Sequence, residues 1–129
     1  MAMEIPLPPS GNDRILAVPL TERLVIFRLT QAQQPNSGDF NVLGSGKAEE
    51  REVPEIHRLG LSFYTTAEAA ALRSNHPRAW VSRIELAASP RIHVARDRVE
   101  PEHIEVWAPR SLDWLSVAEP SVLLPSRRP

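Results

Sequence analysis

The segment from Gly60 to Leu86, GLSFYTTAEAAALRSNHPRAWVSRIEL, constrains the fold more than any other part of the chain. Its start, Leu61 to Tyr64, has the composition of a short β-strand, and a run of strong helix formers follows. Thr65, with Glu68 three residues later, forms a capping box. We therefore expect a strand that turns directly into a helix over Ala67 to Arg73.

The second half of this segment predicts another strand. Asn75 and Pro77 end the helix, and alternation begins at Ala79 and continues to Leu86. Side chains two residues apart on a strand share a face. One face then carries Trp80, Ser82, Ile84 and Leu86, and the other carries Ala79, Val81, Arg83 and Glu85.

The rest of the chain supplies further short elements around this unit. Leu24 to Leu29 predicts a buried strand, whereas Thr30 to Glu55 lacks periodicity and predicts a long loop with a helical turn. Two further strands are expected at Ile92 to Ala95 and at His103 to Ala108. Ser111 is expected to cap a last helix over Leu112 to Val117. This order predicts a small α+β domain with a mixed or antiparallel sheet.

Length and proline content set the limits of that domain. A chain of 129 residues forms one domain, here with a core expected over about residues 14–118. The prolines gather at both ends, and proline lacks a backbone donor and restricts the residue before it. We therefore expect the ends, 1–13 and 119–129, to be extended or flexible.

Composition excludes several classes of function. The formal net charge of −1 gives no global basic field for nucleic acid or anionic membranes. The absence of cysteine excludes disulfides, thiolate metal sites and a cysteine nucleophile. No apolar run is long enough to span a bilayer, and the first residues do not resemble a secretion signal. A cytoplasmic protein without membrane partners is the simplest interpretation.

Arg28 is a charged residue inside an otherwise apolar strand. A buried guanidinium requires a partner, because desolvating an unpaired charge costs several kcal/mol. The sequence leaves two interpretations open. Arg28 either faces the surface near the strand end or clamps an anion such as a phosphate, which its forked geometry matches.

The corner between strand and helix carries the only tyrosine of the chain, Tyr64, together with Ser62 and Thr65. Ser62 and Tyr64 share a strand face by their spacing. On a cleft, the tyrosine ring can stack on a planar base and its hydroxyl can orient a sugar. The alternative is that Tyr64 packs at the edge of the core and Thr65 only caps the helix.

Several carboxylates follow the corner, and any of them can stabilise a cationic sugar carbon if it faces a cleft. A single glutamate is, however, more often a solvated surface charge. The histidines show no metal-binding spacing, so no metal is expected. His103, at the start of a strong strand, is either a ligand contact or a structural residue. The acidic candidates are Glu85, Glu102 and Glu105.

Three pieces of the chain, taken in order, resemble the small ADP-ribosyltransferase-like domains of bacteria and phages, including their toxin-type and RES-like relatives. They are the arginine-bearing strand VIFRLT, the corner GLSFYTTAEAA, and a later strand with a carboxylate, AWVSRIEL or EPEHIEV. The similarity covers about Leu24 to Trp107. It implies a small split β-sheet with short helices.

The resemblance also implies site roles, with NAD as the substrate and no metal. In these families an Arg or His on the first strand holds NAD, the corner lines the nicotinamide pocket, and a Glu assists cleavage at the nicotinamide ribose. Arg28 matches the first position, and His103 is a further candidate for binding NAD. The corner residues are Ser62, Tyr64 and Thr65, of which Tyr64 is also a catalytic candidate, and the acid is one of Glu85, Glu102 and Glu105.

The function that the resemblance implies is ADP-ribose transfer to a macromolecule or hydrolysis of NAD. A toxin or a phage–host conflict protein would suit a chain of this size, with a protein or nucleic-acid target or a cognate antitoxin as partner. Two alternatives stay open. The chain is either a non-catalytic protein-binding module on the same fold or itself an antitoxin or immunity partner.

Overall fold

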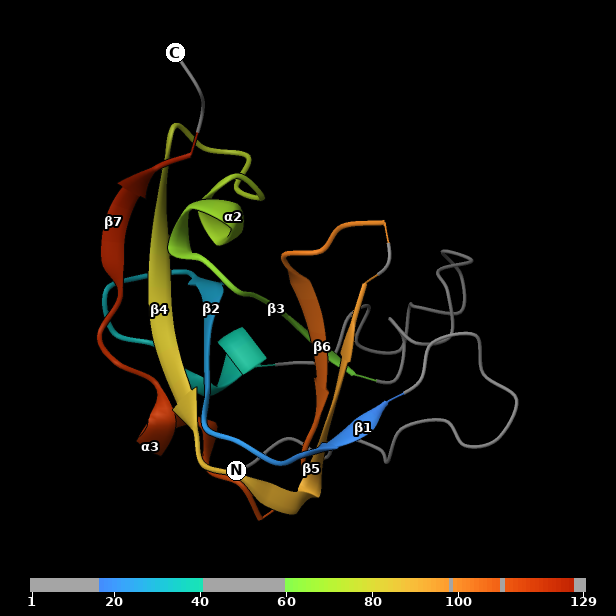
Figure 1. Ribbon diagram of the computed structural model, residues 1–129. Coiled ribbons are helices and arrows are strands. Elements are labelled where there is room, and N and C mark those ends of the chain that lie inside the picture. The colour runs from blue at the N-terminus through green and yellow to red at the C-terminus, as the bar shows by residue number, and fades with distance from the viewer. Residues whose placement is uncertain (1–16, 41–59, 98, 110, 127–129) are drawn as a thin grey trace, which may run out of the picture.

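The computed structural model describes residues 17–40, 60–97, 99–109 and 111–126 (Figure 1). The described part contains seven strands, two short α-helices and one 3-10 helix. They are β1 (Val18–Leu20), β2 (Leu24–Thr30), η1 (Ser37–Phe40), β3 (Leu61–Tyr64), α2 (Ala67–Ala71), β4 (Arg78–Leu86), β5 (Ser89–Arg96), β6 (His103–Trp107), α3 (Trp114–Val117) and β7 (Val122–Pro125).

The seven strands form one sheet in the order β1-β5-β6-β3-β2-β4-β7, and every pairing in it is antiparallel. This confirms the predicted α+β class and selects the antiparallel alternative. The order places β2, β3 and β6 side by side, although the chain separates them by long intervals. The arginine strand, the corner strand and the HIEV strand are therefore neighbours.

The sheet is weakly joined between β2 and β3. Only Phe27 and Tyr64 pair across this seam, whereas β2 and β4 pair along seven residues from Leu24 to Thr30. Figure 1 shows β2 and β3 diverging, with η1 lying in front of the gap between their lower ends. Backbone groups of β2 and β3 near the seam therefore need partners other than each other.

The main apolar core packs against one side of the seam. Phe63 of β3 is fully buried and stacks on Trp114 of α3 with ring centroids 5.2 Å apart. Phe40 of η1 stacks on the same indole at 5.6 Å. A smaller cluster beneath α2 contains Ala70, Ala71, Ala79 and Val81. Small side chains let this short helix lie close to the sheet.

The N-caps of both helices lie one or two residues later than the sequence predicted, although α2 begins at Ala67 as expected. Thr66, not Thr65, is the N-cap of α2, and its hydroxyl accepts the Ala69 N–H at 3.1 Å. Thr65, which directly follows β3, donates its own N–H to the Glu102 carbonyl at 2.8 Å, just before β6. In the same way Asp113, rather than Ser111, caps α3.

The C-terminal segment is more regular than expected. Within the end that was expected to be extended or flexible, Val122–Pro125 forms the strand β7 and pairs with β4 along four residues. β7 is an edge strand, where proline is tolerated. The expected N-terminal end, 1–13, and most of the expected loop lie outside the described residues, but its helical turn is confirmed as η1. In the described part of the chain, no helix is long and apolar enough to cross a membrane.

Candidate functional site

The candidate site is built on one face of three neighbouring strands, β3, β6 and β5. Tyr64 lies opposite His103, and Ser62 lies opposite Glu105. On the other side of β6, Ala95 lies opposite Glu105. Opposed residues in an antiparallel sheet share a face, so polar side chains meet here while Leu61, Phe63, Ile104 and Val106 point to the core.

Arg28 reaches this cluster from β2 across the seam. Its Nε donates to the Asp39 carbonyl and its Nη1 donates to the Ser62 carbonyl, each at 2.5 Å. The guanidinium also lies 5.4 Å from the centre of the Phe63 ring. Burial lowers the pKa of Arg28 to about 10, although the negative charge of Glu105 opposes this, so the side chain remains a cation at neutral pH. Arg28 thus places a positive charge in the seam.

Glu105 is the acid that the fold brings to this cluster. Its side chain is buried, and Oε1 accepts a hydrogen bond from the Ser62 hydroxyl at 2.6 Å. The same oxygen lies 2.9 Å from His103 Nε2. The second oxygen, Oε2, is buried and has no hydrogen-bond partner among the described residues. One oxygen is therefore fixed, and the other is left for a further contact.

His103 bridges two carboxylates. Its Nδ1 lies 3.0 Å from Asp97 Oδ2 and its Nε2 lies 2.9 Å from Glu105 Oε1. Only the imidazolium form has an N–H on both nitrogens. Burial by itself would lower the pKa of His103, but the hydrogen bonds to Glu105 and Asp97 outweigh burial and raise that pKa above its ordinary value of 6.5. The bridge fixes the position of Glu105 Oε1 beside the imidazolium.

This bridge predicts a pH-dependent contribution to stability. The folded protein binds the His103 proton more tightly than the unfolded chain, so the stabilisation is complete below about pH 6.5 and is lost as the pH rises through the folded pKa. We expect His103→Gln to lower the free energy of unfolding by about 1–3 kcal/mol at pH 6 and by less at pH 9. Urea unfolding across this range measures both values.

The exposed His76 provides a matched control for that series. His76→Gln should change stability by no more than about 0.5 kcal/mol at either pH. A His103→Gln effect that stays constant from pH 6 to pH 9 would show that His103 does not carry the proton in the bridge.

Tyr64 closes one end of the cluster. The centroid of its ring lies 5.3 Å from the centroid of the His103 ring. Arg73, which follows α2, places its guanidinium carbon 5.5 Å from the Tyr64 ring centroid. Burial raises the pKa of the Tyr64 hydroxyl, and Arg73 offsets only part of this effect. Tyr64 therefore keeps its proton at neutral pH and presents an aromatic face with a hydrogen-bond donor.

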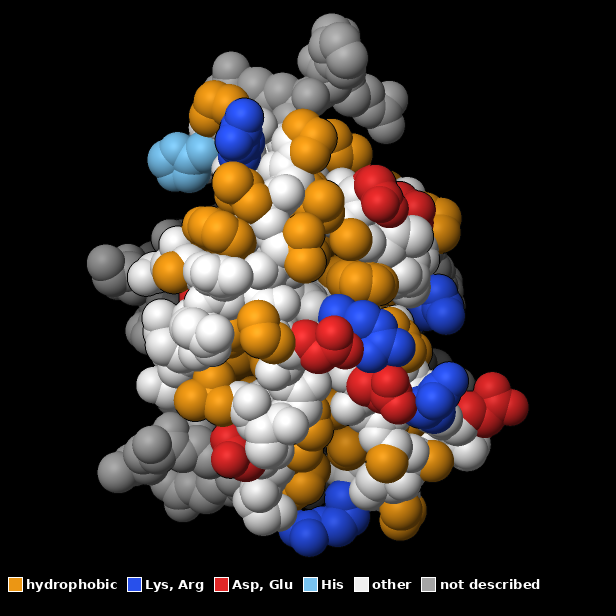
Figure 2. Space-filling view, turned by 90° about the vertical axis from the view of Figure 1, so that its left-hand side faces the viewer, with side chains coloured by type: hydrophobic (Ala, Val, Ile, Leu, Met, Phe, Trp, Pro, Cys, Tyr) orange, Lys and Arg blue, Asp and Glu red, His pale blue; other side chains and the backbone are white. Residues whose placement is uncertain are grey.

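The other sequence candidates lie outside the cluster. Glu85 is on the opposite face of the sheet from Arg28, because its partner in β2 is Val25, and it forms ion pairs with Arg23 at 3.4 Å and Arg83 at 3.1 Å. Figure 2 shows acidic and basic side chains lying next to one another on one face of the molecule.

Glu102 and Thr65 contribute backbone contacts at the edge of the cluster. Glu102 is exposed, and its carbonyl accepts the Thr65 N–H. Of the three acids that the sequence left open, only Glu105 lies beside Arg28, Ser62 and His103.

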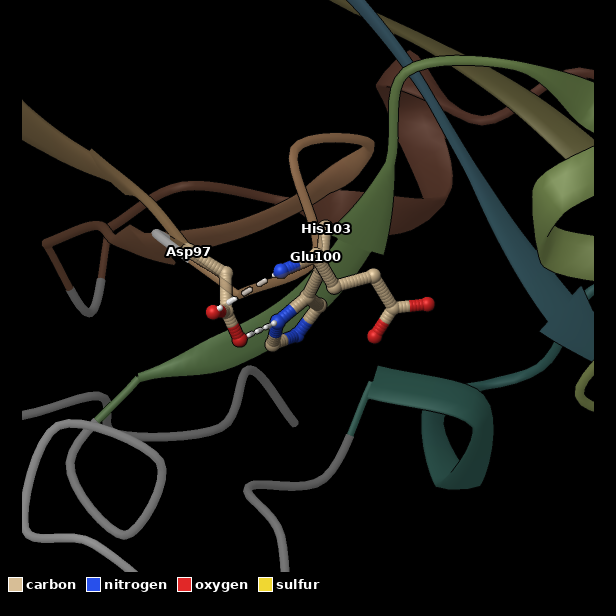
Figure 3. Close-up of side chains that lie close together, drawn as sticks. All are labelled: Asp97, Glu100 and His103. Atoms are coloured by element: carbon tan, nitrogen blue, oxygen red, sulfur yellow. Dashed lines mark hydrogen bonds and ion pairs between the residues drawn. The ribbon is translucent and has the colours of Figure 1, made fainter.

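Asp97, Glu100 and His103 come close enough to suggest a metal site, since one ligand atom from each lies within 4.8 Å of the others. Figure 3 shows that Asp97 points toward the His103 ring and the Glu100 backbone. Its Oδ1 accepts the Val99 and Glu100 N–H groups at 2.8 and 3.2 Å, and Glu100 forms an ion pair with Arg73. These contacts explain why the three side chains lie close together: they close the β5–β6 turn.

Sequence analysis missed three residues of this face: Asp97, Gly60 and Trp107. Asp97 stands six residues before His103, and only the tight β5–β6 turn brings the two together. Gly60 lies against Glu105 and Trp107, and a Cβ at this position would be crowded, 3.0 Å from Trp107 Cε2 and 3.1 Å from Glu105 Oε2. Alternation along HIEVW does place His103, Glu105 and Trp107 on one face, and this signal was available in the sequence.

Comparison of the chain with protein-family models, with curated proteins and with solved structures finds no match. What the site can do therefore follows from its own chemistry. It combines a cation, an oriented carboxylate with one unoccupied buried oxygen, and an aromatic hydroxyl, which together suit a ligand with anionic, hydroxyl and planar parts.

Proposed function

We propose that the chain is an NAD-consuming enzyme of the ADP-ribosyltransferase-like type. The observation that carries the proposal is the connection from Arg28 through Ser62 to Glu105. These residues come from three adjacent strands, and hydrogen bonds link the arginine to the Ser62 backbone and the Ser62 hydroxyl to the carboxylate. Along the chain, the three residues follow the order that the sequence resemblance requires: an arginine strand, then the corner strand, then a strand with a carboxylate.

In the proposed reaction, the bond between the nicotinamide nitrogen and the ribose C1′ breaks. Nicotinamide leaves with the bonding electrons and becomes neutral, while C1′ becomes cationic. The Glu105 carboxylate stabilises that cation, and Arg28 balances the phosphate charge of NAD. Water or a nucleophile of a macromolecule then bonds to C1′ and gives up a proton. The products are nicotinamide and either ADP-ribose or an ADP-ribosylated target.

The resemblance further suggests a toxin or phage–host conflict role, with a macromolecular acceptor or an antitoxin as partner. The direct test measures nicotinamide release from NAD by the purified chain, alone and with protein or nucleic-acid acceptors. Absence of both nicotinamide release and NAD binding would refute the proposal.

Arg28→Lys tests the role of the arginine. Lysine keeps the positive charge but loses the fork that contacts the Ser62 and Asp39 carbonyls. We expect the dissociation constant for NAD to rise about tenfold or more, measured by calorimetry. Arg23→Lys is the matched control, since Arg23 is exposed and contacts Glu85 away from the cluster. Equal NAD affinity in wild type and Arg28→Lys would remove Arg28 from the binding site.

A protein-binding module is the second candidate, and two observations favour it. The Arg28 guanidinium is tied to backbone carbonyls within the chain, as expected of a structural arginine. The edge strand β7 exposes apolar side chains, Val122 at 61% and Leu123 at 40%, and Figure 2 shows apolar side chains in a row on one face. This candidate predicts that Arg28→Lys loses stability without any change in NAD binding.

A further inference from the structure

A pocket of about 390 Å³ lies where the loop after α2 leads into β4, at the upper end of that strand in Figure 1. This volume is within the range of about 300–1,000 Å³ that small-molecule sites occupy. The end of β2, the loop and the start of β4 form its lining. The lining residues that matter for its chemistry are Arg73, Ser74, His76, Arg78 and Trp80.

The charged and titratable side chains of this lining are all basic. Arg73, His76 and Arg78 belong to it, whereas no Asp or Glu does. Arg73 forms an ion pair with Glu100, which lies outside the lining. Arg78 is exposed and forms no ion pair with any other described residue. A guanidinium binds phosphate oxygens through paired N–H groups, so the pocket favours an anion, with Arg78 as its main contact.

Hydrogen bonds hold the loop that borders the pocket. The Ser126 N–H donates to the Pro77 carbonyl at 3.0 Å, and the Ser126 hydroxyl donates to the His76 carbonyl. The His76 N–H donates to the Ser74 hydroxyl oxygen at 3.1 Å, which leaves the Ser74 O–H free to donate to a ligand. A loop that is already ordered loses less conformational entropy when a ligand binds.

Trp80 gives the pocket an aromatic wall. It is partly exposed, whereas Trp107 and Trp114 are buried in the core. Trp80 follows Arg78 by two residues on β4, so both side chains project from the same face of the strand. Indole rings stack on nucleic-acid bases, and this contact tolerates any base because each has a planar face. A phosphate contact and a stacking surface therefore lie next to each other.

We propose that this pocket binds one nucleotide unit, with its phosphate on Arg78 and its base against Trp80. The Ser74 hydroxyl and the Arg73 guanidinium supply further donors. A bare phosphate would leave the indole unused, and an uncharged aromatic compound would leave Arg78 unused. The proposal does not depend on the proposed function, because none of the residues assigned to NAD lines the pocket.

The test is an NMR titration of the tryptophan indole N–H signals with UMP, which is not a part of NAD. The chain has three tryptophans, and Trp80→Phe assigns one signal by its loss. We expect UMP to shift the Trp80 signal and to leave the other two in place. An unmoved Trp80 signal with UMP in large excess, or a shift of the Trp107 signal instead, would overturn the proposal.

Uridine and inorganic phosphate test the two halves of the ligand separately. Each should bind about tenfold more weakly than UMP, because each makes only one of the two contacts. If inorganic phosphate or uridine bound as tightly as UMP, the assignment to a nucleotide would be wrong.

Variants at both contacts test the pocket by affinity. Arg78→Gln should weaken UMP binding about tenfold, since it removes the charged donor. Arg91→Gln is the matched control, because Arg91 is an exposed strand arginine on β5. Trp80→Leu should weaken binding about fivefold or more, whereas Trp80→Phe keeps a ring and should retain most of the affinity. Wild-type affinity in folded Arg78→Gln would contradict the site.

Two oligonucleotides distinguish a free nucleotide from the 5′ end of a single strand. Tighter binding of a 5′-phosphorylated tetranucleotide than of UMP supports a nucleic-acid end, and weaker binding supports a free nucleotide. Equal binding of the tetranucleotide with and without its 5′-phosphate would contradict the phosphate contact at Arg78.

These measurements are separate from the test of the proposed function. Nicotinamide release by a chain that does not bind UMP refutes the nucleotide pocket and supports the enzyme. UMP binding that shifts Trp80, without nicotinamide release or NAD binding, supports the pocket and refutes the proposed function.

Discussion

Replacing Glu105 with Gln is expected to slow nicotinamide release from NAD by about 100- to 1,000-fold, the typical size of removing one electrostatic contact to a transition state. Gln keeps the shape of the side chain and an oxygen that can accept from the Ser62 hydroxyl. It removes the negative charge that would face the cationic ribose carbon. The loss should therefore appear in kcat, with a smaller change in KM.

The controls for Glu105→Gln are the two acids that the sequence could not exclude. Glu85→Gln alters an ion pair on β4, away from the cluster, and Glu102→Gln alters an exposed side chain. Both should release nicotinamide within about twofold of the wild type, since surface substitutions have small effects. A loss in Glu85→Gln as large as in Glu105→Gln would move the catalytic acid out of the cluster to β4.

Stability must be followed alongside activity in Glu105→Gln. The neutral amide no longer attracts the His103 imidazolium, which keeps its ion pair with Asp97. We expect the folded pKa of His103 to fall, because one of the two interactions that raise it is lost. An activity loss at pH 6 and pH 8 alike, with the variant folded at both, assigns the effect to the missing charge.

The strands that carry the site could be predicted because their residues are strongly β-forming. LVIFRL, LSFY and HIEVW are each short, apolar and rich in branched or aromatic side chains. Their adjacency could not be predicted, because it depends on pairing between segments far apart in the chain. The choice between Glu85 and Glu105 depends on the same strand order, which places Glu105 on β6 directly beside the corner strand β3 and Glu85 on β4, on the far side of β2.

The contacts that sequence reasoning missed are also the non-local ones. Thr65 was predicted as the N-cap from a local pattern, but its N–H donates to the Glu102 carbonyl and Thr66 is the cap. β7 was not predicted, because prolines near the end of the chain argue against regular structure. Pro125 pairs with Arg78 at the end of this edge strand, where a missing backbone N–H costs little. Local propensity was overridden at these points by tertiary pairing.

Phe63→Ala is expected to lower the free energy of unfolding by about 3–5 kcal/mol, the range for truncating a buried phenylalanine. Phe63 is fully buried on β3, where only one residue pair joins β3 to β2. Its ring stacks on Trp114 and lies under the Arg28 guanidinium. The ring therefore connects both sides of the seam through side chains where the backbone ladder is nearly absent.

Phe63→Leu and Val99→Ala make this prediction specific. Leucine refills most of the volume but offers no flat ring to Trp114 or Arg28, so we expect a loss of about 1–2 kcal/mol. Val99 is 93% exposed, and its truncation should change stability by less than about 0.5 kcal/mol. Denaturant unfolding measures all three. If Phe63→Ala cost no more than Phe63→Leu, the seam would have to be held by the Arg28 hydrogen bonds alone, and Arg28→Lys would then show the larger loss of stability.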